Sequence, residues 1–165
     1  MSKPRTTKVD FEIRPARTSD APELAKLRYA LRASTGTATE PKPQFIDRCT
    51  KWMRDHLQNE MRWRCLTAEI DSRLVGCLWI QLVEKIPNPR QEPECHAYIT
   101  NFYLEEFARG KGMGSRMLAM AIDWCKQEGA DAVILWPTER SRSLYERQGF
   151  AVRDDLLELR IGRSA

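Results

Sequence analysis

Hydrophobic residues follow different spacings along the chain, and each spacing predicts a different kind of element. Between Asp20 and Leu31 apolar residues recur every three or four positions, which is typical of one face of a helix, and a second such stretch covers 44–61. A third helical stretch has Met113, Met117 and Trp124 on one face and ends at Gly129, and a short helix is expected over 141–148. Alternating or continuous apolar residues predict strands over 11–14, 64–70, 74–83, 95–104, 132–136, 151–153 and 156–161.

The order of these elements predicts an α/β fold. It reads β-α-α-β-β-β-α-β-α-β-β, which favours a mixed sheet with helices on its faces. A chain of 165 residues is long enough to bury one core, so we expect a single domain over 11–163. The residues before it, 1–10, are mostly polar and are expected to form a flexible N-terminus.

Composition narrows the class of protein. The formal net charge of +4 permits an anionic ligand, but it is too small to predict a nucleic-acid partner. No apolar run is long enough to cross a bilayer, so we expect no membrane partner. The cysteine number is odd and no pair has the spacing of a metal site, which indicates reduced thiols, a cytoplasmic location and no metal. These cysteines are Cys49, Cys65, Cys77, Cys95 and Cys125.

Three glycines crowd the start of the third helix, within the stretch ARGKGMGSRM. The first N–H groups of a helix lack partners inside it, and glycines let an anion approach them closely. Arg109, Lys111 and Arg116 add positive charge nearby. The segment lacks the spacing of a P-loop and of the dinucleotide fingerprint. It is therefore either an anion site of another kind or a tight turn that needs glycine for its backbone geometry.

The run Arg109-Gly110-Lys111-Gly112-Met113-Gly114 resembles the acyl-CoA signature of the GCN5-related N-acetyltransferase (GNAT) superfamily, Arg/Gln-x-x-Gly-x-Gly/Ala. The preceding residues, in YITNFYLEEFARGKGMG, resemble the central strand of that family, and LWPTERSRSLYERQGF resembles the segment around its conserved tyrosine. The three pieces cover about residues 95–150 in the correct order. The resemblance implies the GNAT fold, in which a mixed, mostly antiparallel sheet splays between two parallel strands, here 95–104 and 132–136.

The resemblance also implies acetyl-CoA as cosubstrate. The pantetheine arm would pair with the strand backbone in the splay, and the N–H groups of the glycine turn would hold the pyrophosphate. Lys111 and Arg116 are either phosphate contacts or ordinary solvated charges. The cofactor-binding residues expected on this basis are Phe102, Tyr103, Leu104, Arg109, Gly110, Lys111, Gly112, Met113, Gly114, Ser115, Thr138 and Tyr145.

Tyr145 matches the family tyrosine beside the CoA sulfur, so its phenol would donate a proton to the departing thiolate. The alternative is a core tyrosine on a short amphipathic helix. Thr138 stands seven residues earlier, where the family often has Asn. Its hydroxyl would contact the cofactor or cap the following helix.

The general base is less defined by the sequence. Side chains alternate along a strand, which would place Glu94, His96, Tyr98, Thr100 and Phe102 on one face and Cys95, Ala97, Ile99 and Asn101 on the other. Related enzymes often have Glu or His at the places of Tyr98 or Thr100, and neither occurs here. His96 and Tyr98 are our candidates, with a water chain from Glu94, or Glu84, as alternatives. His96 is otherwise a rim residue with a structural hydrogen bond.

The resulting hypothesis is an N-acetyltransferase that moves acetyl from acetyl-CoA to a primary amine, in a small molecule by preference, through a ternary complex. The alternative is a non-catalytic acyl-CoA-binding or regulatory module on the same fold. Members of this superfamily often form homodimers. An apolar C-terminal run could pair across such an interface: Leu156, Leu157, Leu159 and Ile161.

Overall fold

The computed structural model describes residues 10–59 and 62–162, so the flexible N-terminus expected over 1–10 falls almost wholly outside the described residues. One sheet has the strand order β1-β2-β3-β4-β5. The pairs β1–β2, β2–β3 and β3–β4 are antiparallel, and β5 runs parallel to β4. The strands are β1 Glu12–Pro15, β2 Trp63–Ile70, β3 Arg73–Glu84, β4 Cys95–Leu104 and β5 Ala130–Ile134. This mixed, mostly antiparallel sheet confirms the expected α/β fold class.

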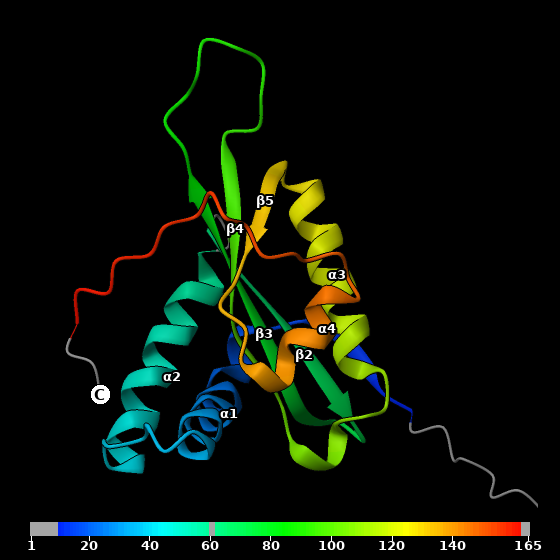
Figure 1. Ribbon diagram of the computed structural model, residues 1–165. Helices are drawn as coiled ribbons and strands as arrows, with labels where there is room; N and C mark the ends of the chain where they lie inside the picture. The colour runs from blue at the N-terminus through cyan, green and yellow to red at the C-terminus, as the bar shows by residue number, and fades with distance from the viewer. Residues whose placement is uncertain (1–9, 60–61, 163–165) are drawn as a thin grey trace, which may run out of the picture.

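Helices cover both faces of the sheet (Figure 1). On one face lie α1 (Ala21–Ser34) and α2 (Lys42–Gln58), which pack on each other. On the other face lies α3 (Met113–Gln127), and the short α4 (Arg142–Glu146) follows β5. Of the predicted helix 44–61, the end at 60–61 lies outside the described residues. No helix in the described ranges combines the length and apolar character that crossing a membrane requires.

Two layers of core follow from this arrangement. The α3 layer contains Ile80 and Ile99 of the sheet together with Met117 of the helix. The layer under α1 and α2 contains Leu24 and Trp79. Because side chains alternate along each strand, Ile80 and Trp79 enter opposite layers. The face of the sheet toward α1 and α2 is therefore distinct from the face toward α3, and this distinction organises the site.

A partly buried ionic cluster fixes the start of α1 to the sheet. Arg14 donates to the Asp20 carboxylate at 2.7 Å and to Glu69 at 2.5 Å. Asp20 also accepts from the backbone N–H of Arg17 at 2.7 Å. Burial raises the pKa of Asp20, but these hydrogen bonds outweigh burial, so its pKa is lowered overall. Ionised Asp20 therefore stabilises the fold.

We predict that Asp20→Asn lowers the free energy of unfolding by about 1.5–3 kcal/mol at pH 7, the range for a hydrogen bond to a charged group. Because the folded-state pKa of Asp20 is lowered, this stabilisation is complete above the unfolded pKa, near 4, and is lost as the pH falls through the lower folded value. Urea unfolding at pH 7 and pH 3 measures it. The difference between wild type and Asp20→Asn should shrink at pH 3. The prediction would be contradicted if the free energies of unfolding of wild type and Asp20→Asn fell equally between pH 7 and pH 3. It would also be contradicted if Asp47→Asn, at an exposed site on α2, had the same effect as Asp20→Asn.

The C-terminal segment departs from the prediction. Neither 151–153 nor 156–161 forms a strand, and the sheet ends at β5. The segment extends away from the sheet (Figure 1), with Leu157, Leu159 and Ile161 at 94%, 82% and 91% exposure. Their alternation is typical of a strand with one apolar face. A strand also needs a neighbouring edge, however, and the alternation does not specify which edge it pairs with.

Candidate active site

The parallel pair β4–β5 separates partway along its length. Paired residues are Cys95 with Ala130, Ala97 with Val133 and Tyr98 with Ile134. Beyond Tyr98, β4 continues to pair with β3 on its other side as far as Leu104. The edge of β4 that faces β5 therefore lacks a strand partner over 99–104 within the described part of the chain. Its backbone groups are available to a ligand, as the splayed sheet in the resemblance implied.

A bulge at Asn101 changes the face to which the end of β4 points. Two steps along β3, from Cys77 to Trp79, stand opposite three steps along β4, from Thr100 to Tyr103. Asn101 has a φ of 49°, in the left-handed region. The expected alternation is therefore wrong past Thr100. Phe102 lies in the α3 layer, and Tyr103 lies in the layer under α1 and α2.

The same bulge places Asn101 on the face toward α1. Its Nδ2 donates to Cys77 Sγ at 3.8 Å, and its Oδ1 accepts from Arg28 at 3.4 Å. Strict alternation put Asn101 on the other face, with Ala97 and Ile99, and that expectation is also wrong. A bulge inserts one residue, and one residue is enough to exchange the two faces.

The glycine turn has the backbone that its composition predicts. Gly110 and Gly112 have φ values of 73° and 78°, which other residues rarely adopt. Gly112 is the N-cap of α3, and no side chain of the described residues caps this helix end. Gly114 packs closely on β4, since a Cβ there would lie 3.4 Å from Leu104. The first N–H groups of α3, from Met113 to Ser115, thus point out of the helix together with its positive dipole end.

The cations around the turn pack on aromatic rings. The Arg109 guanidinium lies 5.7 Å from the Tyr103 ring centroid, Lys111 Nζ lies 5.8 Å from that of Phe107, and Arg116 lies 5.6 Å from that of Phe11. Arg109 Nε also donates to the Leu104 carbonyl at 2.9 Å. Arg109 therefore holds the turn against the end of β4. The Leu104 carbonyl, one of the strand groups expected to bind pantetheine, therefore already accepts a hydrogen bond from Arg109.

Tyr145 of α4 is buried, at 7% exposure, in the layer on the α3 side. Its ring lies edge-on to Phe102, at 6.4 Å between centroids, and to Phe150, at 5.7 Å. Burial raises the pKa of the Tyr145 phenol, and a hydrogen bond with Ser141 acts in the opposite direction. The phenol is therefore protonated at neutral pH and is able to donate a proton.

Thr138 caps the turn that precedes α4. Its Oγ1 accepts from the Ser141 N–H at 3.3 Å, and its own N–H donates to Ser141 Oγ at 2.9 Å. This reciprocal pair is a capping box. Of the two roles open to Thr138, the structure shows the cap, and a cofactor contact stays a prediction.

Tyr98 and His96 lie on the face toward α1 and α2, opposite the layer that holds Tyr145. Tyr98 stands at the last paired position of β4 and packs edge-on against Trp136 at 5.1 Å between ring centroids. His96 is two residues earlier, between the paired positions Cys95 and Ala97. Tyr98 therefore borders the point where β4 and β5 separate. His96 lies in the part of β4 that is still paired with β5.

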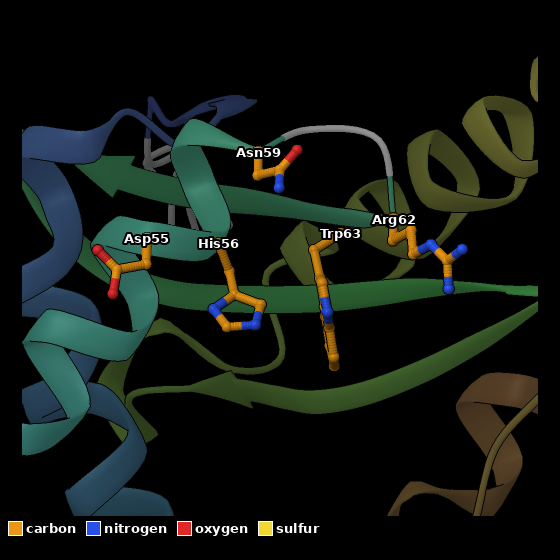
Figure 2. A pocket seen from close by; sticks show the side chains of 5 residues that line it. All are labelled: Asp55, His56, Asn59, Arg62 and Trp63. Carbon is orange, nitrogen blue, oxygen red and sulfur yellow. The ribbon is translucent and has the colours of Figure 1, made fainter.

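A hollow of about 380 Å³ opens on the same face, between the end of α2 and the start of β2. Figure 2 shows its lining residues, Asp55, His56, Asn59, Arg62 and Trp63. His56 stacks on Trp52 at 3.7 Å and lies edge-on to Trp63 at 5.9 Å between ring centroids. Trp63 is in register with Gln81, which is in register with Tyr98. The hollow thus lies two strands away from the splay.

Residues 28–150 match the family model described as "Acetyltransferase (GNAT) family". This span is more than half of the chain, so the chain belongs to the GNAT acetyltransferase family. It is an N-acetyltransferase, an acyltransferase that depends on acetyl-CoA, and its acceptor is not identified. The family match therefore supports the enzyme over the non-catalytic binding module.

The similarity to individual relatives covers most of the chain. The uncharacterised N-acetyltransferase YhfO of Bacillus subtilis (strain 168) is 29% identical over 144 residues, which are 85% of this chain and 89% of YhfO. A predicted acetyltransferase from Clostridium acetobutylicum, solved with acetyl-CoA, has a TM-score of 0.77 at 24% identity and covers 92% of this chain and 97% of its own. An aminoglycoside acetyltransferase from an uncultured soil metagenomic sample, in complex with sisomicin, has a TM-score of 0.71 at 13% identity, covering 93% and 97%. These structural likenesses confirm the GNAT fold.

Proposed function

We propose that this enzyme transfers the acetyl group of acetyl-CoA to a primary amine of a small molecule, by direct attack in a ternary complex. The observation that carries the proposal is the separation of β4 from β5 beside the uncapped glycine turn of α3. The turn offers donors and a positive dipole end to a pyrophosphate. The free edge of β4 offers backbone groups to the pantetheine arm.

The two faces of the opening suit different reactants. Tyr145 lies on the α3 side, and Tyr98 lies on the side of α1 and α2. We place the thioester sulfur beside Tyr145 and the amine on the Tyr98 side. The acetyl-CoA in the Clostridium acetobutylicum structure and the sisomicin in the aminoglycoside acetyltransferase show that this fold accommodates such reactants in those proteins. A small-molecule acceptor is consistent with both.

The reaction requires one bond to form and one to break. The neutral amine nitrogen attacks the thioester carbonyl, a C–N bond forms, and the C–S bond breaks. The thiolate takes a proton from the Tyr145 phenol, and the amine gives up one proton to a base on the other side. We propose that a water held by Tyr98, before His96, accepts this proton and passes it to solvent, because Tyr98 borders the opening. Tyr145 takes a proton back from solvent at the end of the cycle, so protons balance.

A panel of amines tests the proposed function. Each amine is incubated with the protein and acetyl-CoA, and free thiol and acetylated product are both measured. We expect thiol and N-acetyl product in equal amounts with at least one class of amine. Tight binding of acetyl-CoA with no amine-dependent thiol release across primary, secondary and aromatic amines would contradict it.

We also propose that the enzyme is a homodimer in which residues 156–161 of each chain pair with the β5 edge of a second copy. β5 ends the sheet, and its outer edge has no strand beside it in the described residues. The exposed face of Leu157, Leu159 and Ile161 would then be covered.

All five cysteines are free, which is consistent with a reducing compartment. A cytoplasmic location is therefore part of the proposal.

Light scattering at micromolar concentration tests the dimer. We predict twice the chain mass for wild type and the single-chain mass for Leu157→Lys/Leu159→Lys, because two charges would enter the apolar contact. Val152→Lys, at a position that is also exposed but precedes the run, should leave the dimer intact. A wild-type protein with the single-chain mass would overturn the proposal.

A further inference from the structure

Among the described residues, Arg28 has no acidic partner, and it lies on the face where we place the acceptor. It lies on α1, and its side chain is half-buried. Its one hydrogen bond to another described residue is long, 3.4 Å, from Nη1 to Asn101 Oδ1. Burial and then the nearby charge of Arg32 lower the pKa of Arg28. A guanidinium keeps its charge in proteins, and a half-buried charge without an opposite charge is costly.

The position of Arg28 links it to the reacting centre. Its partner Asn101 is the bulge residue of β4, three positions past Tyr98, where the pairing with β5 ends. Asn101 is held at a φ of 49°, a conformation that costs free energy for a residue other than glycine. That backbone turns the Asn101 amide toward Arg28. The guanidinium thus stands beside the opened part of β4, on the side from which the amine would approach.

We propose that Arg28 binds a carboxylate of the acceptor, so that the acceptor is a small amine that also carries a carboxylate, such as an amino acid. This inference rests on the proposed function. A guanidinium presents N–H donors in a planar fork that fits the two oxygens of a carboxylate. Within the described part of the chain, the single hydrogen bond with Asn101 leaves most of these donors free. Arg32, one turn further along α1, is exposed. One half-buried cation suits a singly charged carboxylate better than a doubly charged phosphate.

Pairs of acceptors that differ only in charge test the proposal. Each amino acid is compared with its carboxamide in initial-rate measurements. We expect wild type to prefer the carboxylate in kcat/KM by about 30- to 5000-fold, the range for a buried charge pair that loses one partner. In Arg28→Met and Arg28→Gln, kcat/KM for the carboxylate should fall by this factor. Their kcat/KM for the amide should stay within about threefold of the wild-type value. Arg32→Met, on the same helix, should behave as wild type.

Three outcomes would overturn the proposal. The first is a wild type that uses the amide as well as the carboxylate. The second is an Arg28 variant that loses both substrates equally, because Arg28 would then only support the bulge. The third is a preference for an aminoalkyl phosphonate or sulfonate over the matching carboxylate. Arg28→Gln keeps a hydrogen-bond donor for Asn101, so it separates charge recognition from support of the fold.

A binding measurement separates this proposal from the proposed function. With coenzyme A present, an amino acid at ten times its Kd should raise the Tm of wild type by about 3–5 °C. The amide should give no rise, and neither ligand should shift the Arg28 variants. Carboxylate-specific binding without acetyl transfer would refute the function but keep the site. Transfer to amines without carboxylate-specific binding would keep the function and refute the role of Arg28.

Discussion

Replacing Gly112 with glutamate is expected to abolish the stabilisation of this enzyme by acetyl-CoA. At one hundred times its Kd, acetyl-CoA should raise the Tm of wild type by about 5–10 °C. Gly112 is the N-cap of α3, with open space where a Cβ would lie. A glutamate there would put bulk and negative charge where we place the pyrophosphate. Like charges in contact cost several kcal/mol, so the affinity should fall by about 100-fold or more.

Gly129→Glu is the matched control. Gly129 has a φ of 72° and open space around it, as Gly112 does, but it follows the opposite end of α3. Both variants carry the same backbone strain and the same charge, so a difference between them reports the site. Calorimetry and thermal unfolding with acetyl-CoA measure it. If Gly112→Glu bound acetyl-CoA as tightly as Gly129→Glu, the pyrophosphate would lie elsewhere.

Tyr145→Phe should lower the rate of acetyl transfer by about 10- to 1000-fold with little change in acetyl-CoA affinity. The substitution keeps the ring between Phe102 and Phe150 and removes the proton donor for the departing thiolate. The glycine turn and the β4 edge would still hold the cofactor. Single-turnover measurements are needed, because slow product release can hide a change in the chemical step.

The structural alternative for Tyr145 makes the opposite prediction. If Tyr145 only packs in the α3 layer, Phe preserves the volume of the core and the single-turnover rate should stay near wild type. Tyr29→Phe is a control on α1, where Tyr29 packs against Phe45 at 5.6 Å between ring centroids. An unchanged single-turnover rate in Tyr145→Phe at every pH would remove the phenol from the mechanism.

Local chemistry predicted the parts of the fold that depend on neighbouring residues in the chain. The strand 95–104 matches β4 in both bounds, and the turn at Asp71 and Ser72 joins β2 to β3 with both residues at positive φ. The glycines predicted the turn before α3, because only glycine readily adopts the positive φ values found at Gly110 and Gly112. These features need no knowledge of distant contacts.

The features that the sequence did not predict depend on contacts between distant elements. The bulge at Asn101 has no local glycine to mark it, yet it reverses the faces of Phe102 and Tyr103. Arg28 interrupts the apolar stripe of α1 one turn after Leu24. A charged residue in that stripe is a sequence signal that identifies Arg28 as a candidate functional residue. The C-terminal run has the alternation of a strand, but it pairs with no strand edge in the described chain.

Amide hydrogen exchange with and without acetyl-CoA tests most directly whether the splay and the glycine turn form the cofactor site. We predict slower exchange on binding in peptides covering 99–104 and 110–116, since these carry the free edge of β4 and the first N–H groups of α3. The β2–β3 hairpin, 66–75, should not change. Protection of the hollow at Asp55 and Trp63 with no change at 110–116 would contradict the account.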